Sequence, residues 1–148
     1  MSKKNIFVFS IALLVVFLDQ LTKFLIKQNL KLNQSVPIIK NILHLTYVTN
    51  TGSAFGLFKG MNPIFMIFSI AVIIGIFYYL RKKIKENEKA LQFSAGLLLG
   101  GTIGNLIDRL MYGSVIDFID FRIWPMFNIA DSAVTISVIL LIFLLWEK

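Results

Sequence analysis

Four long apolar runs, each of about 18–21 residues, divide this 148-residue chain and limit what it can fold into. We place them at residues 6–26, 63–80, 90–107 and 129–146. Roughly 20 helical residues cross a hydrocarbon layer of about 30 Å. Because 57% of the residues are hydrophobic and only 16% are charged, the composition excludes a disordered chain and an ordinary soluble globule. We therefore predict an all-α integral membrane protein with four transmembrane helices.

The positive charge of the chain is concentrated between the apolar runs. Fifteen Lys and Arg residues against eight Asp and Glu residues give a net charge of +7, which by itself suits nucleic acid. Because the basic residues occupy short stretches beside apolar runs, we assign them to membrane topology and to contacts with lipid headgroups, and expect no nucleic-acid partner. The chain has no cysteine, which excludes disulfides, thiolate metal sites and a cysteine nucleophile.

Lysine and arginine counts orient the four predicted helices. Residues 81–89 hold five of these side chains, and Lys3 and Lys4 precede the first helix. The connections 27–62 and 108–128 hold four and two. Since the densest positive loop is expected in the cytoplasm, both termini are predicted to be cytoplasmic and the two longer connections to lie outside. The four lysines of 27–62 count against this orientation, because that connection contains no acid to balance them.

The first run also has features of a cleavable signal peptide, because Lys3 and Lys4 precede an apolar stretch. No small-x-small cleavage site follows, and residues 19–23 continue into further apolar sequence. We therefore expect the first run to remain as a helix.

The connection 27–62 is too long for a simple turn. Residues 41–49 are rich in β-branched and aromatic side chains with partial alternation, which predicts one or two strands. Residues 50–53 then provide turn-forming side chains. We expect a small β-sheet on the outer membrane face, within a single membrane-embedded domain formed by residues 1–148.

Asp19 and Lys23 lie four residues apart inside the first run, on one face of the predicted helix. A charge within an apolar span costs about 2.5–3.5 kcal/mol on insertion scales and usually serves a function. An ion pair that makes the helix end tolerable in lipid and a direct role in binding are equally good interpretations, and the two are compatible.

Glycines recur at every fourth residue over 96–104 in the third run, a small-residue stripe that permits close helix packing. The same step reaches Asp108, and Gly101, Asn105 and Arg109 form a second stripe beside it. The closely packed faces therefore carry polar groups toward the outer end of the third helix.

Two aspartates flank the connection between the third and fourth runs. Asp117 lies beyond the third predicted helix, and Asp131 lies fourteen residues later, at the start of the fourth. Antiparallel helices joined by a short connection bring their ends together, so we expect the two carboxylates to face each other. Asn128 lies on nearly the same face as Asp131, and a cap of the fourth helix is as good an interpretation as a role in the site.

Two carboxylates at close range in a low dielectric do not both ionise readily, so one retains a proton and the other is a base. Such a pair can activate water against an amide carbonyl and then protonate the leaving nitrogen. A Ser-His-Asp triad would have to use His44, the only histidine, and nothing marks it for that role. We expect no metal and no cofactor.

Two other functions remain open. One is a phosphotransferase acting on lipid headgroups, with a divalent metal held by Asp108, Asp117, Asp120 and Asp131. These acids lie on the predicted outer side, away from soluble nucleotides. The other is a small channel or transporter subunit that uses Asp19 and Lys23 as a relay, which leaves the paired aspartates unexplained.

Five sequence blocks occur in order at 19–23 (DQLTK), 50–56 (NTGSAFG), 100–109 (GGTIGNLIDR), 115–118 (VIDF) and 127–131 (FNIAD). Together they resemble the blocks of the bacterial lipoprotein signal peptidase family, also called signal peptidase II. Because the blocks extend from the first apolar run to the last, the resemblance covers essentially the whole chain.

The resemblance implies an intramembrane aspartic endopeptidase with four helices, a small extracytoplasmic β-sheet and a further loop beside the active site. Such an enzyme cuts a prolipoprotein just before a cysteine that already carries diacylglycerol. By position, Asp117 and Asp131 match the catalytic pair. The residues that match those around the substrate or the carboxylates are Asp19, Lys23, Asn50, Gly52, Asn105, Asp108, Arg109 and Asn128.

The resemblance also implies the bacterial cytoplasmic membrane as the location, with prolipoproteins and membrane lipids as partners. We expect a monomer whose active site lies near the outer headgroup level, where a membrane-embedded signal helix and its lipid enter sideways between helices. The loop between the two aspartates is short for the family.

Overall fold

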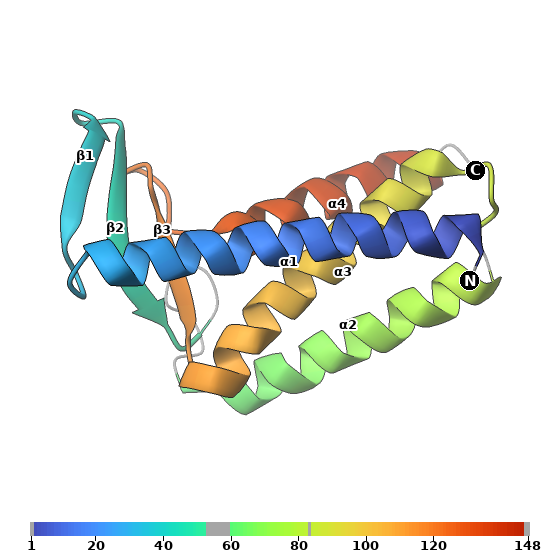
Figure 1. Ribbon diagram of the computed structural model, residues 1–148, viewed down its shortest axis with the longest axis horizontal. Helices are drawn as coiled ribbons and strands as arrows, with labels where there is room; N and C mark the ends of the chain where they lie inside the picture. The colour runs from blue at the N-terminus through green and yellow to red at the C-terminus, as the bar shows by residue number, and fades with distance from the viewer. Residues whose placement is uncertain (1, 53–59, 83, 147–148) are drawn as a thin grey trace.

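The computed structural model describes residues 2–52, 60–82 and 84–146, and these fold into long helices with a small sheet at one end (Figure 1). The helices are α1 (Lys3–Asn29), α2 (Asn62–Lys82), α3 (Lys89–Tyr112) and α4 (Ile129–Trp146). The strands are β1 (Ser35–Ile39), β2 (Leu43–Asn50) and β3 (Val115–Asp120). The predicted four-helix membrane fold with a small β element is confirmed.

All four helices are long and apolar enough to cross a membrane. Their outer surfaces expose large apolar side chains such as Leu13, Phe17, Ile67 and Phe143, as expected where lipid is the solvent. The chain is therefore a multi-pass membrane protein. α3 continues beyond the predicted end at residue 107 to Tyr112. The next residue, Gly113, adopts the left-handed conformation, in which helices commonly end and which glycine adopts without strain.

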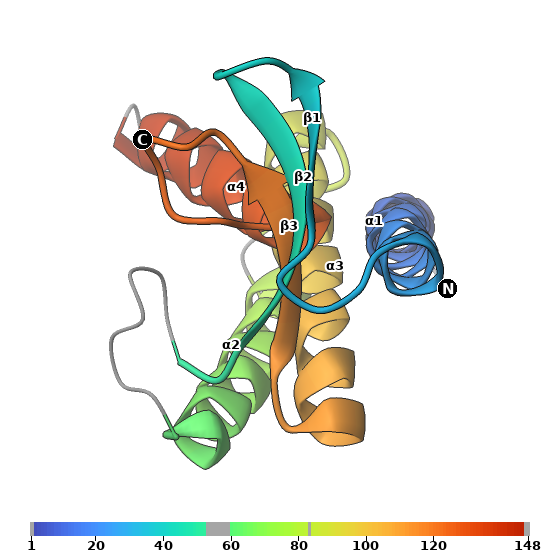
Figure 2. The same ribbon diagram turned by 90° about the vertical axis from the view of Figure 1, so that its left-hand side faces the viewer.

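The helix α3 is the centre of the bundle and packs against α1, α2 and α4. More than half of its apolar span is buried, compared with less than a quarter in each of the other helices. α2 and α4 each pack on α3 but scarcely on each other. Figure 2 shows α1 on one side of α3, with α2 and α4 apart from each other on the other side. This arrangement leaves room between α2 and α4.

Glycines on α3 bring its neighbours close. A Cβ atom at Gly100 would lie 2.7 Å from both the carbonyl oxygen of Ala12 and the Cβ of Val15, on α1. A Cβ atom at Gly101 would lie 2.5 Å from the carbonyl oxygen of Ala130, on α4. The two small-residue stripes of the third run therefore serve different helices, one facing α1 and the other α4.

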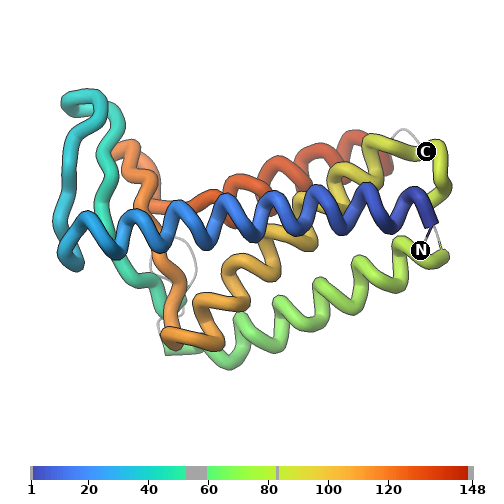
Figure 3. Tube along the Cα trace, viewed as in Figure 1, coloured from blue at the N-terminus to red at the C-terminus, as the bar shows by residue number. Residues whose placement is uncertain are grey.

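The sheet lies across one end of the bundle, which we call the sheet end, and both chain termini lie at the other end (Figures 1 and 3). The strands are antiparallel in the order β1-β2-β3. β2 falls on the stretch for which the sequence predicts strands. β1 and β3 are additional, and β3 holds Asp117, which the sequence places only beyond the third helix.

We predict that Gly100→Ala lowers the free energy of unfolding by about 1–3 kcal/mol, because the added methyl group has no space against α1. Gly75→Ala is the matched control, since a Cβ atom there meets nothing within 4 Å. In that exposed helical position alanine should be neutral or stabilise by up to about 1 kcal/mol. Thermal unfolding of the two purified variants in one detergent measures the difference, and equal midpoints would contradict the packing account.

Candidate active site

The sheet positions Asp117. This residue is buried in β3 and pairs with Val48 of β2. Asn50, the last residue of β2, donates a hydrogen bond from Nδ2 to Asp117 Oδ2 at 3.1 Å. The Oδ1 atom of Asn50 accepts a bond from the backbone N–H of Gly52 at 2.9 Å, so the turn after β2 orients the amide. Positions 53–56 of the second sequence block lie outside the described residues.

Asp131 lies in the first turn of α4 and forms a reciprocal cap with Asn128. Asn128 Oδ1 accepts a bond from the backbone N–H of Asp131 at 2.8 Å, and Asp131 Oδ2 accepts one from the backbone N–H of Asn128 at 3.1 Å. This exchange satisfies two helix N-terminal donors at once. The cap that the sequence suggests for Asn128 is formed, and the same side chain also faces Asp117.

Two asparagines connect the paired aspartates. Asn128 Nδ2 donates to Asp117 Oδ1 at 2.9 Å, and Asn105 Nδ2 donates to Asp131 Oδ1 at 2.7 Å. The amides also bond to each other, from Asn128 Nδ2 to Asn105 Oδ1 at 3.0 Å. Amide groups orient a carboxylate without neutralising it. The two acids are therefore held in place while each remains able to gain or lose a proton.

A buried ion cluster around Lys23 lies directly behind Asn105. Lys23 Nζ is 2.8 Å from Asp19 Oδ2 and 2.9 Å from Asp108 Oδ2. It also donates to Asn105 Oδ1 at 3.1 Å. All three charged side chains are at most 2% exposed. An ammonium group has three donors, and these contacts use all of them.

Both acids of the ion cluster also bind backbone next to the paired aspartates. Asp19 Oδ1 accepts a bond from the backbone N–H of Ala130 at 3.0 Å. Asp108 Oδ2 accepts a bond from the backbone N–H of Ile116, also at 3.0 Å. Each of these amides belongs to the residue that directly precedes one aspartate of the pair. The cluster thus connects the start of α4 and the start of β3 to α1 and α3.

Gln20 also belongs to this network, although it is not among the site residues predicted from the sequence. Its Nε2 donates to Asp108 Oδ1 at 2.9 Å and lies 3.2 Å from Asp19 Oδ2. A polar amide next to Asp19 within an apolar run is the signal that could have identified it.

Arg109 lies one helical turn beyond Asn105. The Cζ atom of its guanidinium is 5.3 Å from the ring centroid of Phe65, on α2, which is within cation–π range. Asn62, at the start of α2, donates to the carbonyl oxygen of Arg109 at 3.4 Å. These contacts link the end of α3 to the start of α2.

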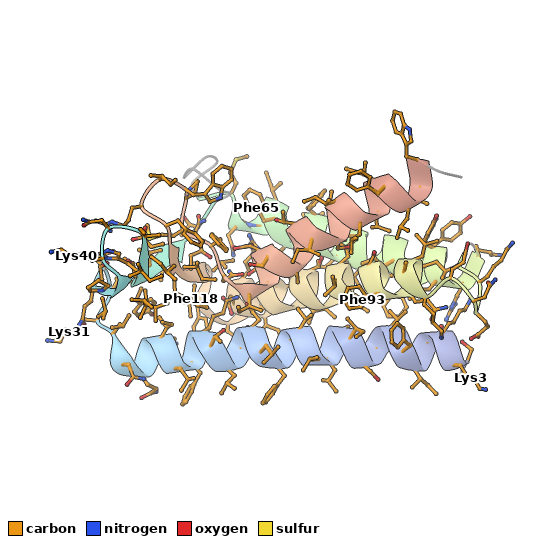
Figure 4. All side chains as sticks on the ribbon, turned by 90° about the horizontal axis from the view of Figure 1, so that it is seen from above. Lys3, Lys31, Lys40, Phe65, Phe93 and Phe118 are labelled. Carbon is orange, nitrogen blue, oxygen red and sulfur yellow. The ribbon has the colours of Figure 1, made fainter. Side chains whose placement is uncertain are left out.

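A cavity of about 840 Å³ lies beside α3, and side chains of α2 and α4 form its other walls. Of the site residues predicted from the sequence, six line it: Asn50, Gly52, Asn105, Arg109, Asp117 and Asp131. Most of the remaining wall is apolar and includes Phe65, Leu98 and Val138. Figure 4 shows Phe65 toward the sheet end. Asp19, Lys23 and Asp108 do not line the cavity and lie behind its wall.

Burial is the largest influence on Asp117 and raises its pKa, and the negative charge of Asp131 raises it further. Hydrogen bonds from Asn50 and Asn128 and the charge of Lys23 act in the opposite direction. The result is a pKa of about 7, against an ordinary value of 3.8. Near neutral pH a large fraction of Asp117 is therefore protonated.

Asp120 is one of the four acids that the phosphotransferase interpretation assigns to a metal, and its side chain binds Thr46 and Arg122. Its Oδ2 accepts bonds from Thr46 Oγ1 at 2.8 Å and from Arg122 Nη1 at 3.0 Å. Within residues 2–52, 60–82 and 84–146, no three His, Asp or Glu side chains are arranged to hold a metal ion. Asp120 is thus paired with Arg122 and is not among the residues that line the cavity.

Two solved structures share this fold, and each is described as a bacterial membrane enzyme determined by the in meso method. The structure at 2.3 Å resolution has a TM-score of 0.89 and 39% identity, covering 95% of this chain and 87% of that chain. The structure at 1.9 Å resolution has a TM-score of 0.86 and 39% identity, with coverage of 95% and 93%. The fold is that of a membrane enzyme.

The family model of signal peptidase (SPase) II matches residues 11–147. A lipoprotein signal peptidase of Halothermothrix orenii is 44% identical over 141 residues, which are 95% of this chain and 96% of that protein. A lipoprotein signal peptidase of Bacillus subtilis is 44% identical over 137 residues, with coverage of 90% and 88%. The chain belongs to the signal peptidase II family and is a protease.

We predict that Asp117→Asn becomes more stable relative to the unsubstituted protein as the pH rises. Between the unfolded pKa of about 3.9 and the folded pKa of about 7, the folded state binds a proton that the unfolded state lacks. Stability therefore falls as the pH rises through this window, and asparagine removes the effect. The gain from about pH 5 to about pH 8 should be on the order of 2–3 kcal/mol.

Thermal unfolding at both pH values measures this change. Asp120→Asn is the control, because the hydrogen bonds from Thr46 and Arg122 outweigh burial and lower the pKa of Asp120, so its titration lies below the window. A stability difference for Asp117→Asn that stays constant with pH would contradict the raised pKa.

Proposed function

We propose that this chain removes the signal peptide from prolipoproteins that carry a diacylglyceryl cysteine, and cuts just before that cysteine. The relatives are named lipoprotein signal peptidases, which supports prolipoproteins as the substrate class. We assign the whole chain to one peptidase domain in the bacterial cytoplasmic membrane, acting as a monomer.

The observation that carries the mechanism is the pair of buried carboxylates bridged by two amides at the wall of a large cavity. We infer that Asp117 and Asp131 share one proton and bind the attacking water between them. One carboxylate accepts a proton from the water as its oxygen attacks the scissile carbonyl. The other carboxyl donates its proton to the carbonyl oxygen, which gives a tetrahedral intermediate. As the C–N bond breaks, the first carboxyl gives the proton taken from water to the leaving nitrogen. A hydroxyl of the intermediate returns a proton to the second carboxylate, so the pair regains its starting state.

The raised pKa of Asp117, about 7, supports this division of labour at neutral pH. A catalytic acid and base work best when their pKa values lie near the operating pH. The amides of Asn105 and Asn128 orient the pair, and neither supplies a positive charge that would hold both acids ionised. The reaction needs no metal in this mechanism.

The cavity supports a membrane-embedded substrate. Its walls come from α2 and α4, which scarcely contact each other, so a signal helix can enter from the lipid without leaving it. Apolar side chains such as Phe65, Leu98 and Val138 line the cavity away from the carboxylates, and suit the signal helix and the acyl chains of the cysteine.

Asn50, Gly52 and Arg109 are proposed to position the substrate backbone beside the carboxylates. All three line the cavity together with the pair. The guanidinium of Arg109 presents several donors in a fixed fork, which suits the carbonyl oxygens of an extended peptide. Four further residues are proposed to hold the segments that carry Asp117 and Asp131 without lining the cavity themselves: Asp19, Lys23, Asp108 and Asn128.

The strand β3 and the start of α4, which carry Asp117 and Asp131, lie at the sheet end, and the termini lie at the other end (Figure 3). The end of α2 and the start of α3, which carry Arg81, Lys82 and Lys89, lie at the end of the termini. By the positive-inside rule, we propose that the termini are cytoplasmic and that the carboxylates lie near the outer face, where a lipidated cysteine resides.

We predict that Asp117→Asn and Asp131→Asn each lower cleavage on the order of a thousandfold or more, because either change removes the shared proton site. Asp120→Asn, the same substitution in the same strand as Asp117, should retain most activity. Single-turnover cleavage of a diacylglyceryl prolipoprotein by equal amounts of folded protein measures this effect.

Addition of a chelator gives a second readout of the same mechanism. Cleavage should be unaffected by it, since the proposed water is activated by carboxylates alone. Near-normal turnover in either of the two variants would remove that residue from the pair, and a strict requirement for magnesium would favour the phosphotransferase.

A further inference from the structure

The hairpin formed by β1 and β2 carries apolar and basic side chains that no part of the described chain covers. Residues 31–42 are exposed without interruption. Their large apolar members are between 37% and 57% exposed: Leu32, Val36, Ile38, Ile39 and Ile42. Lys31 and Lys40 lie among them and are exposed as well. We call these seven side chains the hairpin surface.

Exposed apolar patches of this kind mark a contact with a partner or a membrane. The net positive charge of the connection that contains the hairpin indicates that its partner is anionic. The connection 27–62 contains four lysines and neither Asp nor Glu. Its lysines also oppose the charge bias that sets topology, because positive residues are disfavoured on the outer side. An anionic surface in contact with these lysines offsets that cost.

The position of the hairpin indicates which anionic surface this is. The strands run across the end of the bundle, and the tip between β1 and β2 projects past the helices when the molecule is viewed from the sheet end (Figure 2). Lipid surrounds the helices, so the overhanging tip lies above lipid headgroups. Figure 4 shows Lys31 and Lys40 at this end of the molecule and pointing outward.

The tip itself has a fixed shape. Ile42 donates a backbone hydrogen bond to the carbonyl oxygen of Ile39 at 3.0 Å, and Asn41 adopts the left-handed conformation with φ of 63°, which asparagine tolerates. This tight turn presents Lys40 between two exposed isoleucines. An apolar pair that enters the headgroup layer with a lysine beside it is the arrangement of membrane-surface anchors.

We propose that the hairpin surface binds the bilayer around the protein, with the apolar side chains at the acyl boundary and Lys31 and Lys40 on anionic phospholipid headgroups. This contact fixes the sheet, and with it the Asn50 end of β2, relative to the membrane plane. The inference rests on the membrane location of the chain and on the orientation proposed above, and it does not require the peptidase assignment.

The absence of cysteine from the chain permits a direct test. Full-length protein with Ile38→Cys carries one fluorophore on the hairpin surface and is reconstituted in vesicles of phosphatidylcholine and phosphatidylglycerol. A small fraction of one lipid carries a nitroxide quencher near the headgroup. We expect stronger quenching by labelled phosphatidylglycerol than by labelled phosphatidylcholine, with a preference of about fivefold per lysine.

Lys31→Gln with Lys40→Gln should abolish the preference while quenching by both lipids persists, because the apolar contact remains. Lys3→Gln, at the opposite end and exposed, is the control and should leave the preference intact. Equal quenching by the two lipids in the unsubstituted background would overturn the anionic selectivity. Quenching by neither lipid would overturn the membrane contact.

Two further results would assign the hairpin surface to another partner and overturn the proposal. One is a fluorescence change that depends on protein density and not on lipid, which indicates a second copy of the chain. The other is a change that requires added prolipoprotein, which indicates the substrate. If the full-length protein shows the lipid preference but does not cleave a prolipoprotein, that result would count against the peptidase assignment and not against the hairpin proposal.

Discussion

The rest of this structure depends on the buried ion pairs that the ammonium group of Lys23 forms with Asp19 and Asp108. Two carboxylates and an amide surround this group, and the three charged groups are almost completely removed from solvent. Removing one partner of such a buried pair typically costs about 3–5 kcal/mol, because the other charge remains without compensation. The cluster is therefore stable only when α1 and α3 are packed together, which the glycines of α3 permit.

The cluster connects stability to the candidate chemistry. Asp19 and Asp108 bind the backbone directly before the two paired aspartates, and Lys23 binds the asparagine that holds one of them. Behind the cavity wall, Asp19 and Asp108 share the ammonium group of Lys23. At the wall, Asp117 and Asp131 are held by amides, and among the described residues neither forms an ion pair. The pKa of Asp117 is raised to about 7. Two acids with too little countercharge are destabilising for a fold and useful for proton transfer.

Much of the fold could be predicted from the sequence, because apolar runs and the spacing of Asp19 and Lys23 report on single helices. β3 could not, since it pairs with β2 across more than sixty residues and local patterns carry no information about such a partner. β1 is an edge strand that contains Pro37, and proline argues against a strand when only the local pattern is considered. Gln20 could have been predicted as a polar site residue from its place next to Asp19 in an apolar run, but its partner Asp108, on another helix, could not. The cavity follows from the way α2 and α4 pack on α3 but scarcely on each other, which no local pattern encodes.

The central claim, that two carboxylates share a proton and activate water, is tested most directly by the pH dependence of kcat/KM for a diacylglyceryl prolipoprotein. This quantity reports the acid and base of the free enzyme. We predict a bell-shaped profile whose alkaline limb falls near pH 7, at the pKa of Asp117. Asp120→Asn should leave that limb unchanged. A rate that is constant or still rising between about pH 6 and about pH 9 would contradict the account, because the proton of the pair would then play no part in cleavage.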